Sequence, residues 1–182
     1  MQKQLIKWYQ ENKRDFPWRK DQDPYHIWIS EIMLQQTTTE TVIPYYNRFL
    51  KNFPNVEALA SASLEEVYKM WEGLGYYRRA KHIHESAQII LEKYQGVFPY
   101  EYDAILSLKG IGEYTAGAIS SIAYGKQVPA VDGNVLRIIS RYYLIKENIA
   151  ETKVQKKIYQ IVQELILNHD ASAFNQGMMD LG

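Results

Sequence analysis

Two acidic residues in this chain are candidates for a catalytic role, and the first is Glu31. On a helix its neighbours three and four positions away would be Ile27, Trp28, Leu34 and Gln35. A carboxylate on a mostly apolar face is unusual, because an unpaired charge is seldom buried. Shielding from water would disfavour the charged form, so the side chain would hold a proton that it can donate as a general acid. The alternative is an ordinary glutamate on the surface.

The second acidic residue, Asp132, lies in the segment Pro129-Ala130-Val131-Asp132-Gly133-Asn134-Val135, directly before a predicted helix. Aspartate is among the commonest helix N-caps, so a helix start alone explains its place in the sequence. A functional role for this carboxylate needs a reason beyond the local pattern.

A glycine hairpin, Leu108-Lys109-Gly110-Ile111-Gly112, separates two helical patterns. Both Gly110 and Gly112 are expected to allow positive φ and a close approach of the backbone to a ligand, with Ile111 tucked inward. Outward-facing amides of residues 110–114, at a helix N-terminus, would suit a phosphate. The alternative is an ordinary tight turn between helices.

Aromatic and basic residues alternate between residues 73 and 84, where no acidic residue occurs. Stacking on bases and pairing with phosphates require this mixture. The alternative is a solvated helix start whose two tyrosines belong to the core. The two histidines are spaced i, i+2 and diverge on a helix, so no zinc site is expected. The residues concerned are Tyr76, Tyr77, Arg78, Arg79, Lys81, His82 and His84.

The elements that must position these residues are predicted to be helices. Apolar residues recur at three and four positions in 78–94 and in 154–166, which is typical of helices with one buried face. No stretch alternates with period two, so no sheet is expected. We expect about nine or ten helices joined by short links, an all-α fold.

Capping signals predict where several helices begin and end. Asp23-Pro24 is typical of an N-cap followed by proline, and Ser63 to Glu66 and Thr152 to Gln155 of capping boxes. Gly96 and Gly125 are expected after helix C-termini. Pro44 should kink a helix or begin a new turn.

Composition limits the classes of function. The 182 residues carry 21 Lys and Arg against 21 Asp and Glu, so an anionic partner must be bound by a local basic patch. Absence of cysteine excludes disulfides, thiolate metal sites and a cysteine nucleophile within this chain. No signal-like or membrane-spanning run occurs, so a cytoplasmic location and no membrane partner are expected.

The hairpin followed by Val131-Asp132-Gly133-Asn134-Val135 resembles the helix-hairpin-helix DNA glycosylase superfamily. Within it, the chain is similar to the MutY family of adenine DNA glycosylases from about Trp8 to Gly182. The blocks that carry this resemblance are Trp18-Arg19, Pro24-Tyr25, Ser30-Glu31-Ile32-Met33-Leu34-Gln35-Gln36-Thr37, Gly73-Leu74-Gly75-Tyr76-Tyr77, Asp132-Gly133-Asn134-Val135 and Phe174-Asn175-Gln176.

The resemblance implies hydrolysis of the N-glycosidic bond of an adenine mispaired with 8-oxoguanine or guanine, after the base is extruded from the duplex. Glu31 would protonate the leaving adenine at N7, and Asp132 would stabilise the oxocarbenium-like sugar. Tyr114 and Asn134 would position Glu31 or the sugar-phosphate. Positions near the extruded base match Arg14, Trp18, Arg19 and Leu34. Gln36 and Tyr76 match residues that wedge beside the partner base, and Lys109, Gly110 and Gly112 belong to the DNA-binding hairpin.

Two positions separate this chain from the endonuclease III enzymes that it also resembles. Those enzymes carry a catalytic lysine two residues after the second hairpin glycine, where this chain has Tyr114, and they lack the acid that matches Glu31. Without an amine no Schiff base forms, so a monofunctional glycosylase is expected. The alternatives are an endonuclease III-like glycosylase and lyase acting on another base, such as a mispaired thymine, and a non-catalytic DNA-binding module.

The implied fold has two helical lobes with the active-site cleft between them. Residues 20–133 would form a six-helix lobe with the hairpin, and residues 1–19 with 134–182 a discontinuous second lobe. The family implies a [4Fe–4S] cluster, for which this chain has no cysteine, and a C-terminal domain that reads 8-oxoguanine; we expect a fragment or a cluster-free member. The expected partner is double-stranded DNA containing an adenine mispair, bound by a monomer.

Overall fold

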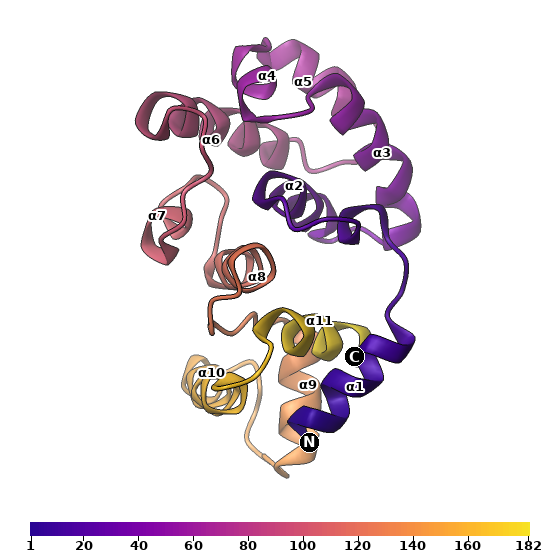
Figure 1. Cartoon of the computed structure of the whole chain (residues 1–182), viewed down its shortest axis with the longest axis vertical. Coiled ribbons are helices and arrows are strands. Elements are labelled where there is room, and N and C mark those ends of the chain that lie inside the picture. The colour runs from indigo at the N-terminus through magenta and orange to yellow at the C-terminus, as the bar shows by residue number, and fades with distance from the viewer. The chain divides into compact units, whose positions relative to one another are not determined.

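The computed structural model describes all 182 residues, and every regular element in it is helical (Figure 1). Eleven α-helices and one 3₁₀ helix are present, more than the nine or ten expected from the sequence. Two of the elements are short: α4 (Val56–Ser61) has six residues and α7 (Tyr102–Leu106) has five. Helices of this length are too short to repeat an apolar pattern, so a count from periodicity tends to be low.

Two compact units make up the chain. Unit 1 contains Met1–Arg14 and Ala116–Gly182, and unit 2 contains Asp15–Thr115. The boundary at Thr115 falls within helix α8 (Glu113–Tyr124). The lobes expected from the sequence, 20–133 and 1–19 with 134–182, place that boundary further along the chain, and their division stays a prediction.

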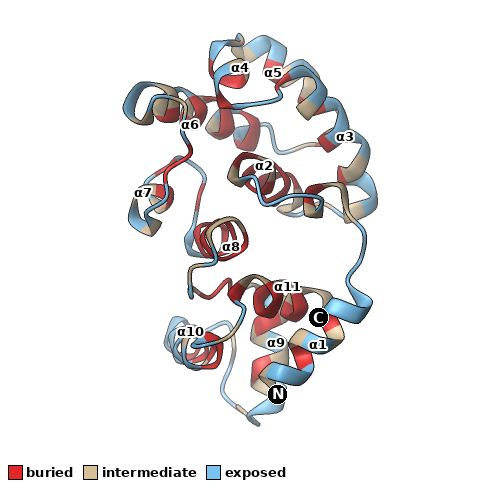
Figure 2. Cartoon of the chain, viewed as in Figure 1, coloured by how far each residue is buried: buried red, intermediate tan, exposed pale blue.

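Unit 2 is built around helix α2 (Pro24–Leu34), which contacts α3 (Thr39–Asn52), α6 (Arg78–Tyr94) and the 3₁₀ helix η1 (Pro17–Arg19). Helix α6 also contacts α4 and α5 (Leu64–Trp71). Eight of the eleven residues of α2 are buried, and Figure 2 shows buried segments on nearly all its sides. A helix that is buried on nearly all sides lies in the core, so the polar side chains of Ser30 and Glu31 on α2 are removed from water.

Unit 1 contains most of α8, together with α1 (Gln2–Asn12), α9 (Gly133–Tyr142), α10 (Thr152–Ile166) and α11 (Ala171–Leu181). Helix α11 contacts α1 and α9, and α9 contacts α10. Their apolar stripes form one core that includes Leu5, Ile139, Ile158 and Phe174. The predicted stripe of α10 is confirmed, since Val154, Ile158, Val162, Leu165 and Ile166 are buried.

Most predicted helix boundaries are confirmed, with one error. Asp23 accepts a hydrogen bond from the Tyr25 amide at 2.8 Å, and Ser63 and Glu66 form the reciprocal capping box. Helix α6 ends before Gly96, and α8 ends before Gly125. The capping box predicted at Thr152 is wrong: the N-cap is Glu151, whose backbone is extended, and no side-chain cap is formed.

Helix α3 continues from Thr39 to Asn52 with Pro44 inside it, so the proline does not start a new helix. None of the helices combines the length and the apolar character that crossing a bilayer requires.

Candidate active site

Glu31 is a buried residue of the central helix of unit 2, with 7% of its surface exposed. Ile27 and Trp28, one turn earlier, are almost fully enclosed, and Leu34 and Gln35 on the other side are half-buried. The alternative of a surface glutamate is therefore wrong. A carboxyl group in this position is largely removed from water.

The first residues of unit 2 place Trp18 and Arg19 near the start of α2. Trp18 is buried, with its ring stacked on Phe16 at 5.0 Å between centroids and edge-on to Tyr46 at 5.5 Å. The Arg19 guanidinium lies 5.0 Å from the centroid of Phe16. Helix η1 contacts both α2 and α3, so these aromatic rings fix the segment that carries Trp18 and Arg19.

Arg14 belongs to unit 1, where its partner could not be inferred from the local sequence. Its guanidinium forms an ion pair with Asp180 of α11, with Nη2 2.8 Å and Nε 3.2 Å from Oδ1. The Asp180 side chain is only 3% exposed, and the two donors hold Arg14 against α11.

Asp132 is the N-cap of helix α9, as the local pattern predicts. Its Oδ1 accepts from the Val135 amide at 2.9 Å, and its Oδ2 accepts from Nδ2 of Asn134 at 3.0 Å. The Asn134 amide is oriented in turn by Arg137, which donates to its Oδ1 at 3.4 Å. These contacts fix the orientation of the half-buried Asp132 carboxylate. They also place the Asn134 side chain directly beside it.

The loop that leads to Asp132 is held by Asn175 of α11, a contact that the sequence did not indicate. Asn175 is 1% exposed; its Nδ2 donates to Ser121 Oγ and to the Val128 carbonyl, both at 2.9 Å. Its Oδ1 accepts from the Ala130 amide at 3.2 Å. One buried amide therefore joins α8, α11 and the segment just before Asp132. The block Phe174-Asn175-Gln176 marked this residue, but its partners lie about 50 residues away and leave no local signal.

The glycine hairpin packs against α6 within unit 2. Gly110 has φ +78°, and a Cβ there would lie 2.8 Å from Nδ1 of His82. Ser86 Oγ donates to the Lys109 carbonyl at 3.2 Å, and the Lys109 ammonium lies 3.2 Å from Glu85. The hydrogen bond from Lys109, together with its positive charge, lowers the pKa of Glu85 below its usual value.

Ile111 is tucked inward as expected, with 8% of its surface exposed, but the expectation of a positive φ at Gly112 is wrong. Gly112 does not adopt positive φ, and a Cβ there would meet no atom within 4 Å. Gly110 alone makes the turn, because it alone is close to a neighbouring helix. Tyr114, in the first turn of α8, is half-buried.

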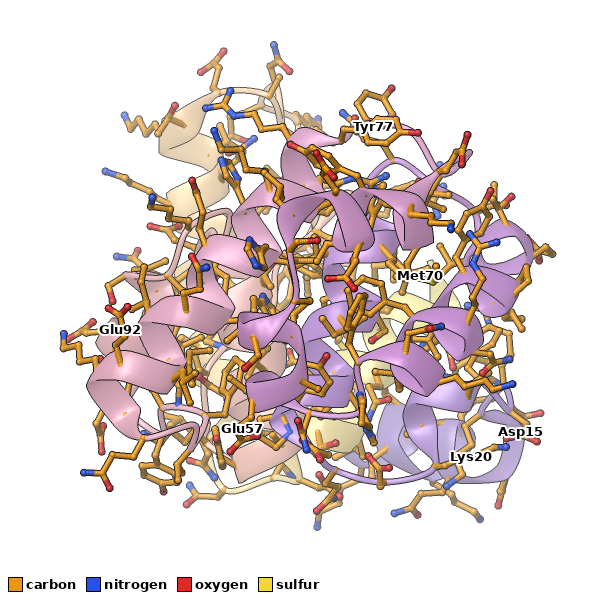
Figure 3. All side chains as sticks on the ribbon, turned by 90° about the horizontal axis from the view of Figure 1, so that it is seen from above. Asp15, Lys20, Glu57, Met70, Tyr77 and Glu92 are labelled. Atoms are coloured by element: carbon orange, nitrogen blue, oxygen red, sulfur yellow. The ribbon has the colours of Figure 1, made fainter.

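The aromatic and basic segment lines a surface groove of about 780 Å³. Tyr76 is 61% exposed and Tyr77 is 43% exposed, and Figure 3 shows the Tyr77 ring at the surface of unit 2. The alternative that both tyrosines belong to the core is wrong. Arg79 is the exception among the cations, because its side chain is buried and faces the protein. The groove is lined by Gln35, Gln36, Tyr76, Tyr77, Arg78, Arg79 and His82.

The residues of this chain do not provide a site for an iron–sulfur cluster. The sequence contains no cysteine, and no group of three or more His, Asp or Glu side chains is arranged to hold a metal ion. His84 instead lies with Nε2 2.8 Å from the Ala62 carbonyl. No chemical step is assigned to a cluster.

These features, a helical fold with a glycine hairpin, a buried acid on a central helix and an aspartate N-cap, agree with the comparison to known families. Residues 29–164 match the HhH-GPD superfamily of base excision DNA repair proteins, and the chain belongs to this superfamily. The expected all-α helix-hairpin-helix glycosylase fold is thereby confirmed.

Similar proteins include adenine DNA glycosylases. The protein of Buchnera aphidicola subsp. Acyrthosiphon pisum is 47% identical over 179 residues, covering 98% of this chain and 51% of that protein. The Homo sapiens protein is 41% identical over 187 residues, covering 98% of this chain and 34% of that protein. The chain thus spans about half the length of the bacterial relative. A solved structure of a thermostable thymine-DNA glycosylase is 31% identical, with a TM-score of 0.88 and coverage of 98% of this chain and 82% of that one.

Proposed function

We propose that this chain hydrolyses the N-glycosidic bond of an adenine mispaired with 8-oxoguanine or guanine in double-stranded DNA. The burial of Glu31 in the central helix is the observation that carries the proposal, because a carboxyl group removed from water suits a general acid. The adenine DNA glycosylases that are 41–47% identical over nearly the whole chain support the choice of base.

In the proposed mechanism Glu31 is the general acid. The adenine anion is a poor leaving group, so the bond breaks readily only when the base takes up a proton, here at N7. The proton passes from the carboxyl group of Glu31 to N7 as the bond between the base and C1′ breaks. General acid catalysis of this kind accounts for about 10²–10⁴ in rate.

Asp132 is proposed to stabilise the sugar after the base departs. The sugar then carries positive charge shared between C1′ and the ring oxygen, and an ionised carboxylate lowers its energy. A pair of unit charges about 4 Å apart, at an effective dielectric constant near 20, contributes roughly 4 kcal/mol, or about 10³ in rate. Water then adds to C1′ and loses a proton. The hydrogen bonds from Val135 and Asn134 support this role by fixing the carboxylate.

The proposed reaction ends with hydrolysis and does not cleave the DNA backbone. A lyase step requires an amine that forms a Schiff base with C1′. Tyr114 occupies the position at which endonuclease III enzymes carry their lysine, and a phenol cannot form an imine. Tyr114 is instead proposed to position Glu31 or the sugar-phosphate.

DNA binding is proposed to use local contacts, since the chain has zero formal net charge. The hairpin with Lys109, Gly110 and Gly112 would hold a phosphate, and the exposed residues Gln36 and Tyr76 would enter the duplex beside the partner base. Trp18, Arg19, Leu34 and Arg14 are proposed to lie near the extruded adenine. One copy of the chain is proposed to bind one duplex.

The proposal is tested by single-turnover release of free adenine from duplexes with adenine opposite 8-oxoguanine, guanine and thymine. Release from the first two, with little from the third, is the expected result. Treatment with borohydride during the reaction should trap little covalent adduct. Absence of adenine release from all three duplexes at saturating enzyme contradicts the proposal.

A second candidate is excision of a mispaired thymine, which the similarity to the thymine-DNA glycosylase structure favours. A duplex with thymine opposite guanine in the same assay distinguishes the two, because only thymine would be released. Binding to every duplex without release of any base would instead indicate a non-catalytic DNA-binding module.

A further inference from the structure

One buried guanidinium, that of Arg79, contacts two separate loops of unit 2. Its Nη1 donates to the carbonyls of Ile32, Met33 and Gln35 at 2.9, 2.8 and 2.5 Å. Its Nη2 donates to Oγ1 of Thr37 at 3.3 Å and to the Gly75 carbonyl at 3.2 Å. These acceptors lie at the C-terminal end of α2 and in the loop before α6, so a single side chain joins the two.

The residues that follow two of these carbonyls have an uncommon backbone conformation. Gln36, after the Gln35 carbonyl, has φ +60°, and Tyr76, after the Gly75 carbonyl, has φ +50°. Residues with a side chain avoid this left-handed region, and each such residue raises the energy of the loop unless its surroundings hold it. The hydrogen bonds of Arg79 are in the right places to do so.

The surroundings of Arg79 keep it in place. Its side chain is 9% exposed, and its guanidinium carbon lies 5.4 Å from the ring centroids of both Trp71 and Tyr76. Burial lowers the pKa of Arg79, but guanidinium groups stay protonated in proteins. The charged group faces the negative ends of carbonyl dipoles at a helix C-terminus, where a cation is favoured.

We propose that Arg79 is a positioning residue that locks both left-handed turns and so presents Gln36 and Tyr76 to the duplex as one preformed pair. The inference rests on the proposed function, in which these two residues wedge beside the partner base. Arg79 itself contacts no DNA in this role. The Gln36 and Tyr76 side chains line the same groove, and they are therefore close enough for Arg79 to hold both turns.

Lysine cannot replace arginine at this site. A planar guanidinium presents donors in fixed directions to several carbonyls at once, whereas an ammonium is a single point with three donors. Arg79→Lys keeps the charge and removes the fork, so it tests geometry rather than charge.

The first measurement needs no DNA. Amide hydrogen exchange is followed at residue 37, whose amide donates to the Leu34 carbonyl, and at residue 79, whose amide donates to the Tyr76 carbonyl. In Arg79→Lys both amides should exchange on the order of 10-fold faster, because the turns open locally. Amides of Ile158 and Val162 in unit 1 should keep their wild-type rates, which a general loss of stability would not allow.

The second measurement uses a duplex with 2-aminopurine in place of the target adenine, whose fluorescence rises when the base leaves the stack. Arg79→Lys should reduce this signal as much as Tyr76→Ala does, and the double variant should lose no more than Tyr76→Ala alone. Losses that add, or a wild-type signal in Arg79→Lys, overturn the proposal.

Arg48→Lys is the matched control. Arg48 also donates to a carbonyl, that of Met70 at 3.0 Å, and lies 4.7 Å from the Tyr45 ring, but it contacts neither turn. This variant should behave as wild type in both measurements.

If Arg79→Lys does not fold, Thr37→Val decides, because it keeps the arginine and removes the hydroxyl that accepts from Arg79 at 3.3 Å and donates weakly to the Gln35 carbonyl at 3.4 Å. Faster exchange at residue 37 then supports the proposal, and an unchanged rate overturns it. A chain that releases no adenine refutes the proposed function, whereas the exchange rates still decide the role of Arg79.

Discussion

Gly117 of helix α8 lies directly against Pro129, with its Cα so close to the proline carbonyl oxygen that a Cβ would collide with it. Through this contact the loop before Asp132 packs directly against α8. Only glycine at position 117 lets the two backbones approach so closely. Asn175 holds the same loop from α11 through Val128 and Ala130. The loop is therefore fixed from two helices of unit 1 before the chain reaches Asp132.

Asn175→Ala should lower the free energy of unfolding by about 1–3 kcal/mol, because it leaves buried polar partners unsatisfied. Among these partners are the Ala130 amide and the Val128 carbonyl. Urea unfolding measures the change. Gln176→Ala is the control, since that half-buried neighbour bonds only Ser172 of its own helix and should change stability little. Equal stability of both variants would contradict the role given to Asn175.

Asp132→Asn should slow single-turnover adenine release by about 10³, because a neutral amide cannot offset the charge of the sugar. Folding should be preserved, since asparagine caps helices as well as aspartate does. The control is Asp170→Asn, which changes another N-cap of unit 1, where the carboxylate accepts from the Ala173 amide at 3.0 Å. An unchanged rate in Asp132→Asn, or an equal loss in the control, would count against this assignment.

Glu31→Gln should reduce adenine release at least about 10²-fold while DNA affinity stays close to wild type, because an amide cannot protonate the base. Release is followed in single-turnover assays and affinity by titration of a labelled duplex at fixed salt. Glu92→Gln, which changes an exposed glutamate of α6, serves as the control. Normal release by Glu31→Gln refutes its role as the acid.

Tyr114→Lys should introduce a covalent intermediate that wild type lacks. A lysine there supplies the amine from which an imine with C1′ can form. Borohydride reduces the imine, and the adduct appears as a slower band on a denaturing gel. Wild-type protein that is trapped as strongly as the variant would contradict the monofunctional mechanism.

Tyr25→Phe should change the dependence of stability on pH. Burial, followed by the nearby charge of Asp23, raises the pKa of Tyr25 well above its ordinary value of 10.0. The stability that the neutral Tyr25 phenol contributes is fully present below pH 10, the ordinary pKa of tyrosine. It is lost as the pH rises further, because the unfolded chain then gives up the proton while the folded chain keeps it.

In Tyr25→Phe the hydrogen bond to the Phe53 carbonyl, 2.8 Å long, is also lost. Stability at pH 7 should therefore fall by about 1 kcal/mol, and the decline toward about pH 11 should be shallower than in wild type. Urea unfolding across this pH range makes the comparison. Parallel decline of the two proteins would show that Tyr25 does not titrate as described.

Local features of the sequence determined the helices. The caps at Asp23 and Ser63 and the stripe of α10 depend on residues three or four positions apart, which any sequence displays directly. The apolar neighbours of Glu31 favoured its burial but left a surface position open, because the helices that pack against α2, α3 and α6 among them, come together only in the tertiary structure. The catalytic roles of Glu31 and Asp132 were inferred from sequence blocks that resemble a known family, and these roles stay predictions.

The tertiary structure alone decided which polar residues are exposed and what they hold. Arg79 and Tyr76 belong to the same basic and aromatic segment, and the sequence did not distinguish their exposure. In the structure the arginine is buried and the tyrosine is exposed. The acceptors of Arg79 include a carbonyl 47 positions earlier, and those of Asn175 include a carbonyl 47 positions earlier in the chain. Contacts at such separations form only when helices pack, since no periodic pattern links the residues concerned, and for that reason the sequence did not reveal them.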